Sequence, residues 1–151
     1  MPRTSRSAAQ VDAVRALARL ARLVERNTGD MSLAHYRVLS AVADGNDRAS
    51  RMAARLVLGK PTISAAVDAL CQRGRLTRES VEGDQRATAL RITPAGTAAL
   101  AAVEESIVSR FAPALARTPD PAQVIESLRW LGVALDELAE ERLATGSVRQ
   151  R

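Results

Sequence analysis

The order of short helical and extended patterns in the middle of the chain constrains its fold more than any other feature. Residues 33–96 read as a helix, a short helix, a tight turn, a third helix, and then two strands joined by a turn. Apolar residues recur every three or four positions in the helical stretches and alternate in the strands. Such an order places one helix where it can enter a DNA groove and a loop where it can lie beside that helix.

Capping and turn residues set the bounds of these elements. Ser32 is suited to be the N-cap of the first helix, and Gly74 is a good residue to follow the third. Residues 44–47 and residues 82–85 are rich in turn-forming side chains. We therefore expect helices at residues 32–43, 50–56 and 61–73, and strands at residues 76–80 and 87–92.

Longer amphipathic segments flank this central region. Residues 8–26 carry an apolar face, and Thr93-Pro94 supplies an N-cap and a first-turn proline for a second long helix. A third begins at Asp120, with a proline at its first position and Gln123 as a capping-box partner. Its apolar residues are spaced alternately 4 and 3 positions apart, from Val124 to Leu138. This spacing is typical of a helix that packs against another helix along a narrow apolar seam. A seam this apolar is expected to be covered by another helix.

The net charge is +5, and its distribution along the chain tells more than its size. Residues 1–30 carry 6 basic and 3 acidic side chains, residues 31–93 carry 10 and 6, and residues 94–151 carry 6 and 8. The positive charge therefore lies on the central region and the segment before it. This is the expected electrostatic footprint of a nucleic-acid-binding protein, although a solvated arginine-rich surface would look the same.

Several classes of function lack the residues that they need. Cys71 is the single cysteine and His35 the single histidine, so neither a disulfide within the chain nor a dedicated metal site is expected. The sequence holds no glycine-rich phosphate loop and no catalytic motif, so we expect neither an enzyme nor a cofactor. No apolar run has membrane-spanning length and no secretory signal follows the first residues, which favours a cytoplasmic location.

The third helix of the central region has two different faces. With Ile63 at the centre of the inward face, Val67 and Leu70 fall close to it, because successive residues turn by about 100°. The opposite face is small and nearly uncharged, and the unpaired N–H groups of the helix N-terminus favour a phosphate. The candidate DNA-contacting residues of this helix are Lys60, Pro61, Thr62, Ser64, Ala65 and Asp68.

The hairpin is basic near its turn. Arg78 and Arg91 project from the strands, and Arg86 lies beside the turn, where a basic side chain can enter a minor groove. Asp84 is close enough in sequence to hold the Arg86 guanidinium in a bidentate pair. The alternative is that Arg86 is an ordinary exposed turn residue. On the first interpretation, the candidate DNA-contacting residues of the hairpin are Arg78, Asp84, Gln85 and Arg86.

These runs, in this order, resemble the MarR family of bacterial transcription regulators. Residues 52–56 (MAARL) are similar to the LAxxL helix of the family, and residues 60–64 (KPTIS) to the opening of its recognition helix. The end of that helix is matched by residues 67–74 (VDALCQRG). Residues 84–86 (DQR) match the D-x-R signature of the wing, and residues 92–96 (ITPAG) resemble the LTxxG that follows it.

The resemblance implies a mainly α-helical homodimer with a small two- or three-stranded β wing. Residues 31–93 would form a winged helix-turn-helix DNA-binding domain, and residues 8–27 and 94–144 a helical dimerisation region, with tails at 1–7 and 145–151. Two copies would straddle a pseudo-palindromic operator as a regulator, most often a repressor that a small ligand or an oxidant releases. The residues expected at the dimer interface are Val11, Val14, Leu17, Phe111, Val124, Leu128, Leu131, Leu135 and Leu138.

The chain departs from the family pattern on its recognition helix. Ala65 and Ala69 stand where family members often carry arginine or another long polar residue, so bidentate arginine–guanine contacts from this helix are unavailable to it. Thr62 and Ser64 can form hydrogen bonds, and the Ala65 methyl can touch a thymine methyl. Specificity is therefore expected to depend on the wing, phosphate contacts and DNA shape. Val57 also occupies a position where the turn usually has glycine.

Other interpretations of single residues stay open. A ligand pocket is expected between the dimerisation helices and the winged domain, with His35, Tyr36, Arg37 and Trp130 as candidate lining residues, although each also fits a core, surface or interface role. Cys71 flanks the recognition helix and is a candidate redox switch, but no resolving thiol is near it in the sequence. The alanine-rich outer face also suits a winged-helix protein that docks a protein partner instead of DNA.

Overall fold

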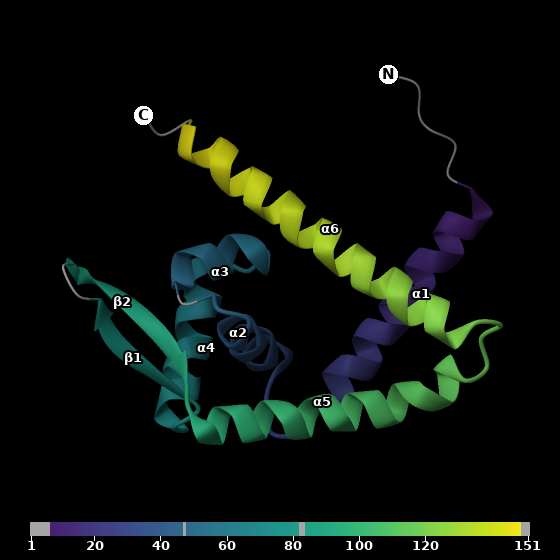
Figure 1. The fold of residues 1–151 in the computed structure, drawn as a ribbon, viewed down its shortest axis with the longest axis horizontal. Coiled ribbons are helices and arrows are strands. Elements are labelled where there is room, and N and C mark those ends of the chain that lie inside the picture. Colours follow the sequence, from purple (N-terminus) through teal and green to yellow (C-terminus); the bar gives the residue numbers. More distant parts are fainter. Residues whose placement is uncertain (1–6, 47, 82–83, 149–151) are drawn as a thin grey trace.

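A computed structural model describes residues 7–46, 48–81 and 84–148. The three short helices of the centre and the hairpin gather into one unit, and α5 runs along one side of it (Figure 1). The helix α6 extends from the far end of α5, and α1 extends away from α5 with its C-terminal end beside that helix (Figure 1). The fold is mainly helical with a small β-hairpin, as the sequence predicts. The elements are α1 (Ala8–Arg26), α2 (Leu33–Ala43), α3 (Ala49–Arg55), α4 (Lys60–Gln72), β1 (Leu76–Val81), β2 (Asp84–Ile92), α5 (Pro94–Leu115) and α6 (Pro121–Val148).

Side-chain caps explain where the helices begin. The Ser32 hydroxyl accepts the backbone N–H of His35 at 3.1 Å, and Thr93 caps α5 in the same way. At the start of α1, Ser7 and Gln10 form a reciprocal capping box. α1 therefore begins at Ala8, as the sequence predicts, and Ser7, the last residue before it, is its N-cap.

The last helix is longer than its apolar pattern predicts. Asp120 caps its start by accepting the N–H of Gln123 at 3.0 Å. The Gln123 side-chain amide donates to Ser127 at 3.2 Å, where the sequence predicts that it reaches back to the cap. The helix continues to Val148, beyond the tail boundary expected at residue 145. A polar helix end can persist when hydroxyl groups bond back to the preceding turn, as Thr145 does.

The hydrophobic core lies inside the winged domain. It is built from the inward faces of α2, α3 and α4, the base of the hairpin, and the first turns of α5. Burial of these apolar side chains is the main favourable term in folding this unit. The largest fully buried side chains are Leu39, Met52, Ile63, Leu70, Leu76 and Val38.

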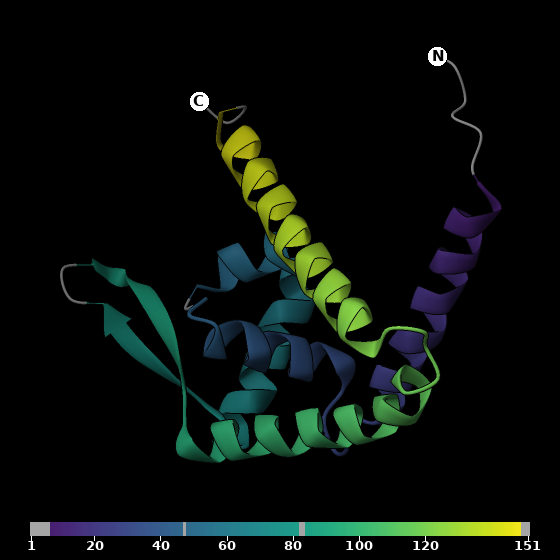
Figure 2. The same ribbon diagram turned by 45° about the vertical axis from the view of Figure 1, so that its right-hand side comes forward.

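The hairpin forms a two-stranded antiparallel sheet in the part of the chain that the structure describes. Leu76 pairs with Ile92 at its base, and Ser80 pairs with Thr88 further out, where the register shifts. Leu90 is buried at the base, and Thr88 is exposed. The hairpin therefore leaves the core as it lengthens, and both views show it projecting away from the helices (Figures 1 and 2).

The junction between the hairpin and α5 is very tight, and this explains Gly96. A Cβ atom at this position would lie 2.1 Å from the carbonyl oxygen of Arg75 and 2.9 Å from Cγ1 of Ile92. Thr93 holds the same junction: its N–H donates to the Arg75 carbonyl at 3.1 Å and its hydroxyl to the Gly74 carbonyl at 2.6 Å. Only glycine lets α5 approach the root of the hairpin this closely.

The turn between α3 and α4 contains a strained residue. Val57 has a φ of 51°, in the left-handed region, and its side chain is 73% exposed. The N–H of Leu58 donates to the Ala53 carbonyl at 3.1 Å and completes the end of α3. The turn thus keeps the geometry that glycine would supply, and it does so with a β-branched residue whose Cβ crowds the backbone.

The helices α1 and α6 lie outside the core. No residue of α1 is buried in the single chain, although one of its faces is apolar. In α6, Ala139 is buried where the helix packs against α3. Both views show α6 passing close to α3 on its way from the end of α5 (Figures 1 and 2).

Candidate nucleic-acid interface

The helix α4 divides into the two faces that its sequence predicts. Ile63, Ala66, Val67 and Leu70 are buried against α2 and α3. The other face is open to solvent and bears short side chains, which would let a DNA groove come close to the backbone. Its exposed residues include Lys60, Pro61, Thr62, Ser64, Ala65 and Asp68.

The first turn of α4 is free to receive an anion. Gly59 is its N-cap and offers no side chain to bond the first N–H groups, and Pro61 has no N–H. The backbone N–H groups of Lys60 and Thr62 therefore point out of the helix end without an intrahelical acceptor. Together with the exposed ammonium group of Lys60, they can hold a DNA phosphate.

An ion pair joins α4 to the hairpin. Arg78 Nη2 lies 2.5 Å from Asp68 Oδ1, and this hydrogen bond is the main reason that the pKa of Arg78 is raised. Both side chains are about half exposed, so the pair adds little to stability, but it fixes the angle between α4 and β1. Asp68 thus has a partner within the chain that the sequence pattern did not reveal, and the pair neutralises a carboxylate on the face expected to meet DNA.

The basic side chains of the hairpin are not all near its turn. Arg78 pairs with Leu90 in the register and Arg91 with Thr77, so both lie toward the base. Arg91 Nε also lies 3.2 Å from Glu79 Oε2, which neutralises it in part. The expectation that both arginines sit near the turn is therefore wrong.

The tip of the hairpin carries the expected wing residues. The backbone of β2 begins at Asp84, which pairs with Val81. The side chains of Asp84, Gln85 and Arg86 lie outside the part of the chain that the structure describes. The expected Asp84–Arg86 pair therefore remains a prediction.

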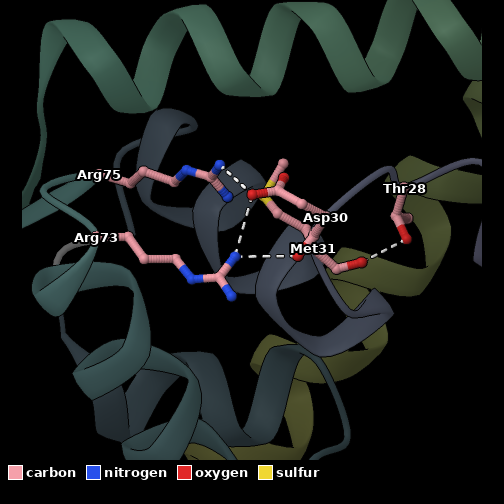
Figure 3. A network of polar contacts seen from close by, with 5 residues as sticks. All are labelled: Thr28, Asp30, Met31, Arg73 and Arg75. Carbon is pink, nitrogen blue, oxygen red and sulfur yellow. Dashed lines mark hydrogen bonds and ion pairs between the residues drawn. The ribbon is translucent and has the colours of Figure 1, made fainter.

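A second polar network ties the loop after α1 to the end of α4 and to the residue just before β1 (Figure 3). Arg73, the C-cap of α4, donates to the Asp30 carbonyl at 3.0 Å and lies 3.2 Å from Asp30 Oδ2. Arg75 Nη2 lies 2.7 Å from the same oxygen. The hydrogen bond from Arg75 and the charges of both arginines lower the pKa of Asp30. Thr28, a buried polar residue, steadies the loop by donating to the Met31 carbonyl at 2.6 Å.

The candidate pocket residues are not brought together in one cavity. His35 lines an open hollow of about 430 Å³ with Pro61, Thr62 and Ala65 of α4, and burial followed by Arg73 and Arg75 lowers its pKa. Tyr36 packs against the core, and burial and then Glu104 raise its pKa. Arg37 donates to the Leu56 carbonyl at the end of α3. Trp130 is 58% exposed on α6, so these four side chains do not define a common site.

Cys71 is half-buried on the flank of α4, and its thiol is free. The structure places it among the residues that pack against the core. Its redox role therefore stays a sequence-based hypothesis.

Most of the candidate dimer residues are large apolar side chains that are exposed to solvent in the single chain. On α6 the four leucines of the seam are exposed, and on α1 two of the three candidate residues are exposed. Phe111, Val11 and Val124 are partly buried. An apolar stripe of this kind marks an interaction surface. The exposed fractions are Val14 64%, Leu17 44%, Leu128 37%, Leu131 44%, Leu135 58% and Leu138 46%.

Three helices, a tight turn and a projecting hairpin define a winged helix-turn-helix protein. Residues 29–87 match the model of the MarR family. The winged helix-turn-helix region of this chain therefore matches the MarR family, and the resemblance seen in the sequence is confirmed. No curated protein matches the chain.

Solved structures with similar folds extend the likeness to the flanking helices. A MarR-family transcriptional regulator from Rhodococcus sp. is 19% identical with a TM-score of 0.68, over 89% of this chain and 96% of that one. The PcaV regulator of Streptomyces coelicolor, in complex with its natural ligand, is 21% identical with a TM-score of 0.62, over 89% and 97%. CouR from Rhodococcus jostii, bound to p-coumaroyl-CoA, is 21% identical with a TM-score of 0.64, over 83% and 87%. None of the helices described is long and apolar enough to cross a membrane.

Proposed function

We propose that this protein is a homodimeric DNA-binding transcription regulator, a repressor that a small ligand releases. The observation that carries the proposal is the exposed outer face of α4, which lies beside an open helix N-terminus and a projecting hairpin. In this proposal α4 enters the major groove and Arg86 reaches the adjacent minor groove. Its place of action is the cytoplasm, where bacterial DNA lies.

Dimerisation is proposed from the apolar surface that the single chain leaves open. The α6 seam and one face of α1 expose valine and leucine side chains that no other element of the described chain covers. A second copy would bury both surfaces through the same symmetric contact. Two winged domains would then face two half-sites about one helical turn apart.

Sequence readout by α4 would be weak in the proposed complex. Thr62 and Ser64 are exposed and can bond to base edges or phosphates, and Ala65 offers only a methyl group. Phosphate contacts from Lys60 and minor-groove contacts from Arg86 would then supply most of the affinity, and DNA shape much of the specificity. We expect Arg86→Ala to weaken operator binding by about tenfold or more while leaving the dimer intact.

The proposal that a small ligand releases the protein rests on similar proteins, two of which were solved with a ligand bound, p-coumaroyl-CoA in CouR and the natural ligand in PcaV. In this chain His35 and Trp130 are the aromatic side chains most open to such a molecule, although they do not share a cavity. A thermal-shift screen of aromatic carboxylates and their thioesters would test the proposal. A ligand that raises the melting temperature and weakens DNA binding supports it, and a screen without such a ligand contradicts it.

DNA binding itself is tested by titrating the purified protein against the DNA upstream of its own gene at two salt concentrations. Specific binding should survive excess unrelated DNA, and its affinity should fall steeply with salt, with a logarithmic slope of about −0.9 per phosphate neutralised. Arg86→Ala should reduce that affinity. Binding that is absent, or that ignores salt, would contradict the proposal and favour a protein partner on the alanine-rich face of α4.

A further inference from the structure

The structure points to a use for α6 beyond dimerisation. Arg55 Nε donates to Asp136 Oδ1 at 2.8 Å and Arg55 Nη2 to Asp136 Oδ2 at 2.5 Å, so the two side chains form a bidentate pair. The residues are 81 positions apart and join α6 to α3, the first helix of the helix-turn-helix. We propose that this pair is a tether through which α6 sets the position of its own winged domain in the dimer.

The face of α6 that carries the tether differs from the face proposed for the partner. Asp136 and Ala139 lie toward α3, where Ala139 is almost fully buried. The seam residues Leu131, Leu135 and Leu138 are exposed, and at about 100° per residue Asp136 lies about 100° or more from each of them around the helix. Ala139 lies between the two faces, about 40° from Leu135. A single rigid helix would therefore hold α3 on a face that adjoins the one proposed for the partner. This step rests on the proposed dimer.

The packing beside the tether is centred on a small side chain, that of Ala139, which is almost fully buried where α6 meets α3. Next to it, a cleft of about 400 Å³ opens between α3 and the end of α6, and its lining includes Arg51, Arg55, Ala139, Glu140 and Leu143. A methyl group makes few dispersion contacts, so this packing brings the two helices together but leaves much of their relative orientation to the ion pair. The Arg55 side chain is 28% exposed and that of Asp136 45%, so the pair is partly shielded and its two hydrogen bonds fix an orientation.

Loss of the tether should let the winged domain move relative to α6. Only some of the resulting arrangements would match the spacing of two half-sites. The apparent affinity for a full operator would then be the original affinity multiplied by the fraction of arrangements that match. We expect Asp136→Ala to weaken binding to the optimal operator about fivefold, the order for one partly exposed ion pair between elements. Binding to a single half-site should not change.

Glu126→Ala is a matched control on the same helix. Glu126 forms a bidentate pair with Arg129, at 3.0 and 2.8 Å, but both residues belong to α6. The control removes the same kind of interaction without touching a contact between elements. The combined variant Arg55→Asp with Asp136→Arg reverses the pair and should restore both the geometry and the affinity.

The movement can be measured without DNA and within one chain. Spin labels at Gln72→Cys on α4 and Glu137→Cys on α6, both exposed positions, report the distance between the two helices in a Cys71→Ser background. Labelled chains are mixed with excess unlabelled chains, so that each pair of labels lies in a single chain. The starting protein should give one narrow distance distribution, Asp136→Ala a broader one, and both Glu126→Ala and the reversed pair the narrow one.

The second measurement compares operators whose half-sites differ in spacing by one base pair. Asp136→Ala should flatten the preference for the best spacing, and Glu126→Ala should not. An unchanged distance distribution in Asp136→Ala, or an unchanged spacing preference, overturns the tether. If the starting protein binds no DNA at all, the proposed function fails, and the spin-label distances alone decide whether the tether exists.

Discussion

The close packing around Gly96 predicts that Gly96→Ala lowers the free energy of unfolding, which is opposite in sign to the usual effect of this substitution in a helix. In most helices, replacing glycine by alanine stabilises the fold by up to about 1 kcal/mol, because alanine has the higher helix propensity. At Gly96 the added methyl would lie 2.1 Å from the Arg75 carbonyl oxygen, whereas ordinary contact begins at 3.4 Å. Either α5 or the root of β1 must therefore move by about 1.3 Å.

The magnitude follows from what that movement disturbs. The hydrogen bonds from Thr93 to the carbonyls of Arg75 and Gly74 would lengthen or break, and each contributes about 1 kcal/mol. Ile92, already 2.9 Å from the added atom, would have to repack, at about 1–3 kcal/mol for an overpacked site. After the gain in propensity is subtracted, we expect Gly96→Ala to lower the free energy of unfolding by about 3 kcal/mol.

Urea denaturation followed by circular dichroism at a fixed protein concentration measures this change. Gly132→Ala in α6 is the matched control, because nothing lies within 4 Å of its added methyl. The control should be unchanged or more stable by up to about 1 kcal/mol. If Gly96→Ala matched the control, the close approach of α5 to Arg75 would be wrong.

Three further perturbations test other features. Val57→Gly should raise the free energy of unfolding by about 1 kcal/mol in the same urea assay, because it relieves a left-handed valine at φ 51° whose exposed side chain buries little; a loss of stability would contradict the strain. Leu131→Asp should shift the protein to monomers in sedimentation, and a persistent dimer would exclude the α6 seam as the interface. The arginines lower the pKa of Asp30, so its ion pairs stabilise the fold above the unfolded value of 3.8 and are lost as pH falls through the lower folded value. Asp30→Asn should therefore be less stable than the starting protein at neutral pH, and the difference in urea midpoints between the two proteins should vanish in acid. The same difference at neutral and at acid pH would show that the charge of Asp30 is not involved.

Local chemistry is what the sequence predicts best in this protein. Ser32 and Thr93 cap their helices because a hydroxyl beside a helical start needs only residues three positions away. Gly74 takes the left-handed conformation that ends α4. The two faces of α4 follow from periodicity alone, and this part of the candidate site is as expected.

The ion pairs between elements could not be predicted in the same way. Asp68 reads as an exposed residue on the outer face, and only the angle between α4 and β1 brings it to Arg78. Arg55 and Asp136 meet because α6 folds back along α3, which no periodic pattern encodes. The end of α6 differs from the prediction for a related reason: the polar residues from 145 onward predict a tail, whereas α6 continues to Val148.

The residues of α4 that hold the domain together are not the residues that are proposed to contact DNA. Every buried side chain of α4 points the same way, and Ala65 on the other side carries a methyl group that is exposed to solvent. A single base change in the codon for Ala65 can therefore introduce a longer side chain without disturbing the core. Such a chain could acquire a new operator while keeping its stability, which makes the domain a convenient starting point for regulators with altered targets.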